Sequence, residues 1–202
     1  MNIINSLKFT VVIIIISIIL TPSVTSSEIE WEELKNINLE KLETNSDDLL
    51  ARFEYAIALA NLGQVEESYE QFDILGEEET KGREVIKEHK QNLEQDSILK
   101  LNYRAFLALT DAQYEQSIDY FYDIIELDPE NVWIYNYLAA SYLELEEYEA
   151  AKEILDQALE IKDNGYSHLI YGIIYWENGQ YINAARSFSR SGKIFDILRD
   201  HF

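Results

Sequence analysis

The chain has 202 residues, of which 47% are hydrophobic, enough for one elongated domain with its own core. It carries 38 acidic and 16 basic residues, a formal charge of -22. An acidic surface of this kind repels phosphate backbones, so we expect no nucleic-acid partner. Two prolines and seven glycines favour long helices joined by short turns. The sequence has no cysteine, which excludes disulfides, zinc–thiolate sites and cysteine nucleophiles.

Residues 1–26 are typical of a secretory signal peptide. Lys8 is the only charged residue among them, and a run of apolar residues at 9–20 is followed by small and polar ones. A membrane-spanning helix needs about 20 apolar residues, and this run is shorter. We therefore expect an exported protein, periplasmic or secreted, that is cleaved after Ser26. The alternative is a membrane anchor formed by residues 9–20, with the remaining chain outside the cytoplasm.

Residues 27–46 are expected to form a helix that caps the rest of the domain. Trp31, Leu34 and Ile37 recur at helical spacing. A helix at this place would cover the open end of the first unit of the repeat that follows.

A tyrosine recurs in a repeating pair of helices. Tyr114 and Tyr148 are 34 residues apart, and Tyr181 follows 33 residues later. Each is followed three residues on by a small residue and four beyond that by a large one: Ser117, Ala151 and Ala184, then Phe121, Leu155 and Phe188. This period predicts an all-α solenoid of stacked helical hairpins. About four units fit the chain: 49–79, 98–131, 132–164 and 165–202.

The pattern resembles the tetratricopeptide repeat (TPR) family. The resemblance rests on three features. Each first helix has a small residue (Ala105, Ala139 and Gly172), and a turn residue precedes each tyrosine (Ala112, Glu146 and Gly179). The third feature is Pro129, which ends a helix. The first unit matches less well, because Val65 replaces the tyrosine. The resemblance implies a scaffold that binds a protein or peptide, and it does not identify the partner.

Two segments depart from the period. Residues 80–97 place about 15 extra residues between the first and second units, and Val85, Ile86 and Leu93 favour an extra helix there or an extension of the next one. Residues 180–200 are expected to continue as one helix.

No motif for catalysis, metal binding or cofactor binding is present. The three histidines, His89, His168 and His201, do not share a helix face at metal-ligand spacing. The sequence contains no glycine-rich phosphate loop and no GxSxG elbow. An enzyme whose site is built from the acidic clusters stays a third possibility, and we expect a protein that is not an enzyme and has no cofactor.

By analogy with TPR folds, the first helix of each unit should line a concave groove. The expected partner-binding residues are apolar or aromatic, with two asparagines: Phe53, Ile57, Asn102, Phe106, Leu109, Trp133, Asn136, Tyr166, Ile173 and Trp176. The alternative is that the N-terminal helix or the insert of the same chain fills this groove. A rival function is that of a structural subunit of an envelope or secretion assembly. Such a subunit would use the convex face or the basic C-terminal helix, which could also mediate self-association.

Overall fold

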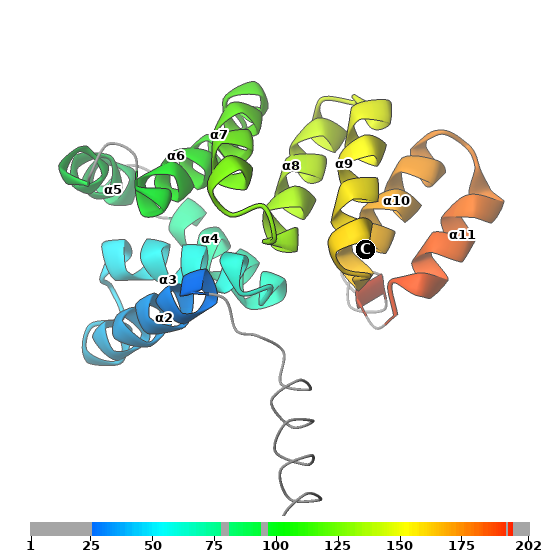
Figure 1. Cartoon of the computed structure of the whole chain (residues 1–202). Helices are drawn as coiled ribbons and strands as arrows, with labels where there is room; N and C mark the ends of the chain where they lie inside the picture. Colours follow the sequence, from blue (N-terminus) through cyan, green and yellow to red (C-terminus); the bar gives the residue numbers. More distant parts are fainter. Residues whose placement is uncertain (1–25, 78–80, 94–96, 193, 196–202) are drawn as a thin grey trace, which may run out of the picture.

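The computed structural model describes residues 26–77, 81–93, 97–192 and 194–195, and every regular element in these ranges is an α-helix. The proposed signal peptide therefore lies outside the described residues, apart from Ser26. The helices follow one another as hairpins (Figure 1), which confirms the all-α solenoid. Their bounds are α2 Ser26–Thr44, α3 Leu49–Asn61, α4 Val65–Glu77, α5 Lys81–Asn92, α6 Ile98–Thr110, α7 Tyr114–Leu127, α8 Val132–Glu144, α9 Tyr148–Ile161, α10 Gly165–Glu177 and α11 Tyr181–Arg190.

The turns inside the four helical pairs share one backbone feature. The residue two positions before each second helix has a positive φ: Gly63 at 75°, Ala112 at 55°, Glu146 at 59° and Gly179 at 68°. A left-handed residue at a helix end turns the chain sharply and lets the last carbonyls of the first helix be satisfied. The repeated turn residue of the sequence is therefore the hinge of each hairpin.

Small side chains allow the paired helices to approach closely. Ala151 of α9 and Ala184 of α11 are fully buried, as is Ser117 of α7, whose hydroxyl lies 2.9 Å from the hydroxyl of Ser141 in α8. The large residue of each pattern fills the space beside them, and Phe121 and Leu155 are fully buried. Alternating small and large residues thus produce a continuous core along the solenoid.

The first pair departs from regular stacking. The insert forms a separate helix, α5, as one of the two sequence interpretations expected. The α3–α4 pair lies below α6 and α7 in Figure 1, and α3 contacts α8 of the third pair as well as α5 and α6. This placement brings the first pair against the face formed by the first helices of the later units.

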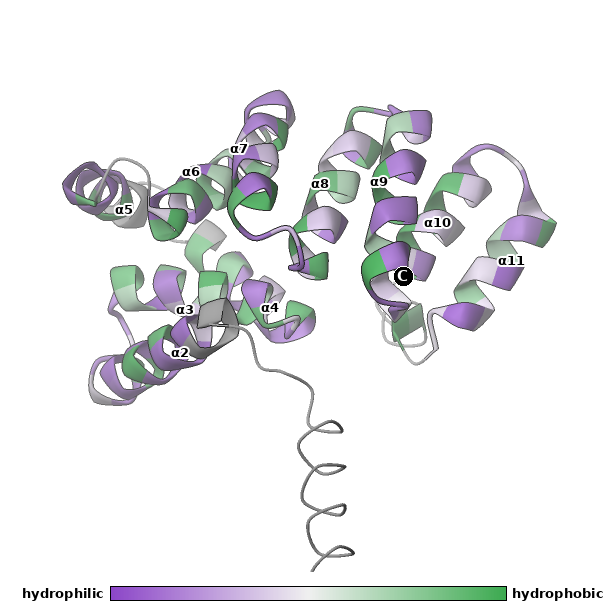
Figure 2. Ribbon diagram, viewed as in Figure 1, coloured by the Kyte–Doolittle hydropathy of each residue, from purple (hydrophilic) through white to green (hydrophobic). Residues whose placement is uncertain are grey.

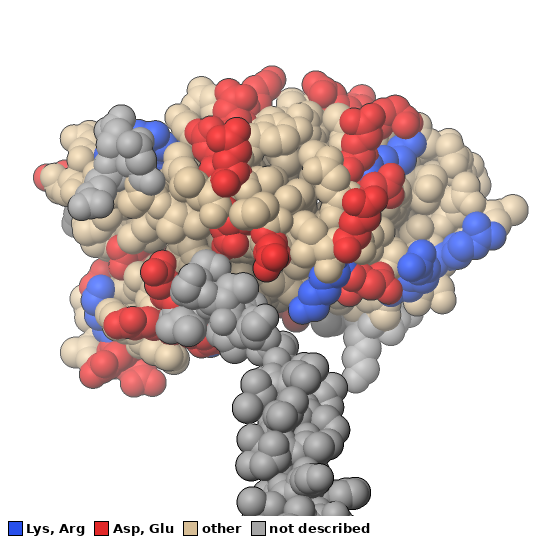
Figure 3. Space-filling view, in the orientation of Figure 1, with Lys and Arg blue, Asp and Glu red and all other residues tan. Residues whose placement is uncertain are grey.

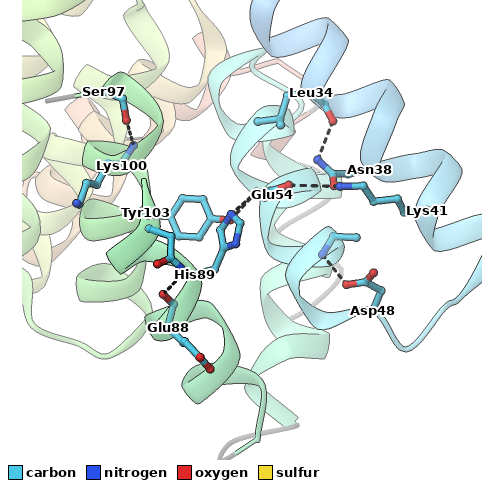
Figure 4. A network of polar contacts seen from close by, with 12 residues as sticks. Leu34, Asn38, Lys41, Asp48, Glu54, Glu88, His89, Ser97, Lys100 and Tyr103 are labelled. Atoms are coloured by element: carbon cyan, nitrogen blue, oxygen red, sulfur yellow. Dashed lines mark hydrogen bonds and ion pairs between the residues drawn. The ribbon is translucent and has the colours of Figure 1, made fainter. Parts of the chain in front are cut away.

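A buried polar network joins the insert to the N-terminal helices (Figure 4). The Glu54 carboxylate of α3 accepts a hydrogen bond from the Tyr103 hydroxyl of α6 at 2.7 Å. Lys41 of α2 and His89 of α5 lie 3.8 and 3.5 Å from the same carboxylate. Burial, and then the Glu54 charge, raise the pKa of Tyr103 above its ordinary value. Side chains of α2, α3, α5 and α6 therefore meet at the Glu54 carboxylate.

Both ends of the solenoid bear on function. At the N-terminal end α2 packs on α3, with Trp31 buried, and it exposes Glu33 and Glu40 as well as the apolar Ile37 and Leu39. At the other end α11 stops at Arg190, so the single helix expected over 180–200 is wrong. Gly192, with φ at 65°, ends it, because a left-handed residue cannot continue an α-helix.

Candidate functional site

The first helical pair occupies the concave face that the sequence predicted as the binding groove. Three asparagines link it to the later units: the Asn131 amide donates to Asn61 at 3.0 Å, and the Asn61 amide donates to Asn102 at 2.7 Å. Asn61 ends α3, whereas Asn102 lies in α6 and Asn131 precedes α8. The asparagine expected to bind a peptide backbone at position 102 is therefore bonded within the chain.

Aromatic residues of the expected groove contact the same pair. Phe106 of α6 stacks on Phe72 of α4, with ring centroids 5.4 Å apart. The Tyr166 hydroxyl of α10 donates to Glu66 of α4 at 3.0 Å, and burial, followed by this carboxylate, raises the pKa of Tyr166. The Trp133 ring of α8 lies against the turn between α3 and α4.

The other expected groove residues are also mostly covered. Phe53 and Ile57 lie in the core, and Leu109 and Ile173 are half-buried. Asn136 is buried and accepts a hydrogen bond from Ser167 at 2.7 Å. Of the ten residues, all in the described part of the chain, only Trp176 is exposed. Their role in partner binding stays a prediction, and a partner on this face would have to displace α3 and α4.

An open apolar hollow lies at the C-terminal end of the solenoid. It measures about 710 Å³ and we call it the terminal aromatic pocket; it is lined by Trp176, Tyr181, Ala185, Phe188, Ser189, Gly192 and Phe195. Trp176 and Tyr181 meet edge to face at 5.1 Å, and Phe188 stacks on Phe195 at 4.5 Å. Paired aromatic rings of this kind supply large apolar area with few rotatable bonds.

Glycine at position 172 fixes one wall of this pocket. A Cβ atom there would lie 2.3 Å from the Phe188 ring, so the ring can rest on α10 only because α10 has no side chain at this point. The small residue by which the sequence resembles TPR units therefore also positions a pocket residue.

A smaller polar groove of about 290 Å³ runs beside the pocket, between α9, α10 and α11. Buried His168 lies 2.6 Å from Asp163, and Arg190 lies 3.9 Å from the same carboxylate. The Tyr171 hydroxyl donates to Asp156 at 2.5 Å, and burial, followed by this carboxylate, raises the pKa of Tyr171. These groups pair with one another across the helices.

Charge is distributed unevenly over the surface. Figure 3 shows acidic side chains along α7 and α9 and basic ones gathered near α11. The exposed acids of α7 and α9 are Glu115, Asp119, Asp123, Glu126, Glu149, Glu153, Asp156 and Glu160. The α11 sequence has Arg186 and Arg190 and no acidic residue. The ribbon in Figure 2 alternates apolar and polar along most helices, as expected where one face packs on a neighbour.

Among the described residues, no group of three or more histidines and carboxylates could hold a metal ion. Within those same ranges, no helix has the length and apolar character needed to cross a membrane.

Of the residues that line the terminal aromatic pocket, only Trp176 was predicted from the sequence as a binding residue. Trp176 was expected in a groove, whereas Tyr181 and Phe188 were interpreted as repeat positions of the core. In α7 and α9 the equivalent positions are covered by the next unit. Among the described residues, Trp176 and Tyr181 stay exposed at α11, and the repeat pattern does not distinguish such a position from a covered one.

Comparisons with known proteins agree with this architecture in its central part. A tetratricopeptide repeat family model matches residues 108–174. No curated protein matches the sequence. Among solved structures, MamA from Desulfovibrio magneticus RS-1 is 15% identical, with 84% of this chain and 95% of that chain covered and a TM-score of 0.46. A thermophilic TPR protein from Thermus thermophilus is 15% identical over 80% of this chain and 81% of that one, with a TM-score of 0.48. The central units of this all-α solenoid are therefore similar to tetratricopeptide repeats, a fold that generally serves as a protein-interaction scaffold.

Proposed function

We propose that the protein is a non-enzymatic interaction scaffold that binds a protein partner at the terminal aromatic pocket. The observation that carries this proposal is the exposure of large apolar side chains at one end of the solenoid. Trp176 is 56% exposed, Tyr181 61% and Ile182 79%. Exposed aromatic residues around a hollow are the usual anchors of protein interfaces.

The concave groove is the second candidate site. One of its polar closing contacts favours it, because Tyr166 and Glu66 form their hydrogen bond at the exposed surface and not in the core. A peptide could compete for such a contact more readily than for a buried one. In this case the α3–α4 pair would be a removable occupant, and the partner would replace it.

Export is the third part of the proposal. It is supported by the order of residues 1–26, with one lysine, then an apolar run, then small and polar residues. N-terminal sequencing of the protein from its native source tests it. A chain that begins near Ser27 is expected, whereas an intact N-terminus in the membrane fraction would indicate an anchor.

The binding proposal is tested by affinity capture with the full chain and two variants. Proteins retained from a native extract are identified, purified and titrated against the wild type, Trp176→Ala/Tyr181→Ala and Trp133→Ala. We expect the pocket variant to weaken binding by about 2 kcal/mol or more, as loss of central aromatic anchors does. Glu115→Gln, on the exposed face of α7, is the control. Unchanged binding by the pocket variant, with loss in Trp133→Ala, would assign the site to the groove.

A further inference from the structure

We infer that the terminal aromatic pocket receives a proline-rich segment of a partner protein in the polyproline II conformation. This inference rests on the proposed function and specifies the class of partner for the same site. It depends on three observations about the pocket: its lining has no charged side chain, two hydrogen-bond donors on it have no protein partner, and its aromatic rings recur along α11 at a suitable spacing.

The lining of the pocket is uncharged. Its side chains are aromatic, small or hydroxyl-bearing, and none is an acid or a base. The arginines of α11, Arg186 and Arg190, line the separate polar groove with α9 and α10, where Arg190 lies 3.9 Å from Asp163. A charged segment would lose its hydration in the pocket without meeting an opposite charge. The pocket therefore fits a neutral occupant.

Two hydrogen-bond donors lie on this apolar surface without protein partners. Within the described ranges, neither the indole N–H of Trp176 nor the hydroxyl of Tyr181 bonds to another residue. Both side chains are exposed, so water satisfies these groups in the free protein. An occupant that covers them must replace the water with acceptors, because a buried donor without a partner is costly.

A polyproline II segment meets both requirements. Its backbone makes no internal hydrogen bonds, so its carbonyl groups are free to accept, and its prolines have no N–H to leave unpaired against the rings. The carbonyls of an α-helix are used inside the helix, and an ordinary extended strand would press its own N–H groups against the aromatic rings. Aromatic-lined grooves are a recurring site for proline-rich segments.

The spacing of the rings fits the same conformation. Tyr181 meets Trp176, and Phe188 stacks on Phe195. Tyr181 and Phe188 are seven residues apart in α11, which puts them on one face of the helix and about 10 Å apart along its axis. Polyproline II rises about 3.1 Å per residue with three residues per turn, so prolines i and i+3 lie about 9 Å apart on one side. Ala185, between the two aromatic pairs, leaves this space open. Two prolines three residues apart can therefore contact one aromatic pair each.

Two synthetic probes test the inference with the full chain. One is nonaproline, which is a polyproline II helix in water, and the other is a glycine–serine peptide of the same length; both carry fluorescein. Fluorescence anisotropy gives the two dissociation constants. We expect nonaproline to bind at least ten-fold more tightly than the control peptide. High salt should not weaken it, because no charged group takes part in recognition.

Two variants locate the contact. Tyr181→Phe keeps the ring and removes the donor, so it should weaken nonaproline binding about three- to ten-fold. Tyr69→Phe makes the same change at an exposed position of α4 and should have no effect. Ser189→Trp places a large ring among the pocket residues and should weaken binding at least ten-fold, whereas Glu126→Trp on the exposed face of α7 should not. Circular dichroism melting of each variant checks that the fold is retained.

Several results would overturn the inference. Equal binding of the two probes, or full nonaproline binding by Ser189→Trp, would show that the pocket does not select a proline-rich segment. Nonaproline binding only after truncation at Phe195 would make residues 196–202 the occupant. Concentration-dependent dimerisation lost in Ser189→Trp would make it a second copy. If Trp176→Ala/Tyr181→Ala loses the natural partner but nonaproline does not bind the wild type, the inference fails while the proposed function stands.

Discussion

The indole ring of Trp133 lies directly against Gly63, the turn residue of the first helical pair. A Cβ atom at position 63 would come within 2.1 Å of ring carbon Cε2. Tyr166 meets the same ring edge to face, with centroids 6.1 Å apart. This contact ties the α3–α4 turn to α8 and α10, and it is the point at which the first pair is held on the concave face.

We predict that Gly63→Ala lowers the free energy of unfolding by about 2–4 kcal/mol. A left-handed alanine contributes roughly 1 kcal/mol of this, and overpacking against the ring adds about 1–3 kcal/mol. In a Trp133→Ala background the second contribution disappears, so the two changes should be strongly non-additive. Urea unfolding of the four proteins gives the coupling free energy. Additive effects would show that the ring does not rest on this turn in solution.

The sequence predicted the hairpins well and the position of the first pair poorly. Periodic positions such as Ser117 and Ala151 report contacts between neighbouring helices, and these follow from local spacing. The contact between Asn61 and Asn131 joins residues 70 apart across the insert. No periodic signal marks such a contact, because the length of an insert does not fix the direction in which the chain returns.

The candidate site was predictable to a similar degree. Asn102 and Phe106 were correctly expected on the inner helix of the second unit, but their burial depends on Asn61 and Phe72, which come from the first. An apolar residue on a helix face has the same sequence pattern whether its own chain or a partner covers it. Only the packing of the first pair distinguishes the two.

Removing the Asn61 amide should destabilise the closure of the groove. Asn61→Ala deletes both the donor to Asn102 and the acceptor of Asn131, in a position that is only 2% exposed. We expect a loss of about 1–3 kcal/mol, because buried polar groups of both partners lose a hydrogen bond. Asn36→Ala, on the exposed face of α2, is the matched control and should change stability by less than about 0.5 kcal/mol. Chemical denaturation measures the free energy of unfolding of both variants. Equal losses would contradict the hydrogen bonds from Asn131 to Asn61 and from Asn61 to Asn102.

The turn between α8 and α9 is a site for stabilisation. Glu146 has a φ of 59°, which costs a residue with a Cβ atom about 1–2 kcal/mol. Glu146→Gly removes this strain, and after the greater entropy of the unfolded chain is counted we expect a net gain of about 0.5–1 kcal/mol. Glu153→Gly, at an exposed position inside α9, has no strain to relieve and should lose about 0.5–1 kcal/mol. Melting temperatures that move in the same direction would refute this interpretation of the turn.

The helix crossing in the third unit should not tolerate a larger side chain. Ala151 is fully buried, so Ala151→Leu should overpack the contact between α8 and α9 and cost about 1–3 kcal/mol. Glu149 lies two residues earlier, and its side chain is 87% exposed and pairs with Lys152. Glu149→Gln should therefore stay within about 0.5 kcal/mol of the wild type. Thermal unfolding of both variants checks the register, and equal losses would contradict it.

Alkaline pH should destabilise the junction of α2, α3, α5 and α6 at the Glu54 carboxylate, because Tyr103 is a titrating group of this junction. Burial raises the pKa of Tyr103 above 10.0, so its stabilising effect is complete below pH 10 and is lost as pH rises toward the folded pKa. Above pH 10 the unfolded tyrosine ionises while the folded one stays neutral. The free energy of unfolding then falls by up to about 1.4 kcal/mol per pH unit from this group. Tyr103→Phe removes that dependence, and it also deletes the 2.7 Å hydrogen bond to Glu54.

The variant should therefore be less stable at pH 7, by about 1–3 kcal/mol, and should lose less stability between pH 10 and 11. Urea midpoints measured from pH 7 to 11 give both curves, which should converge as pH rises. Tyr69→Phe, at a 70% exposed position on α4, is the control and should follow the wild type throughout. Parallel curves for Tyr103→Phe and the wild type would mean that Tyr103 titrates alike in the folded and unfolded chains. The hydroxyl would then not be held neutral against Glu54, and the junction of α2, α3, α5 and α6 would have to rest on packing alone.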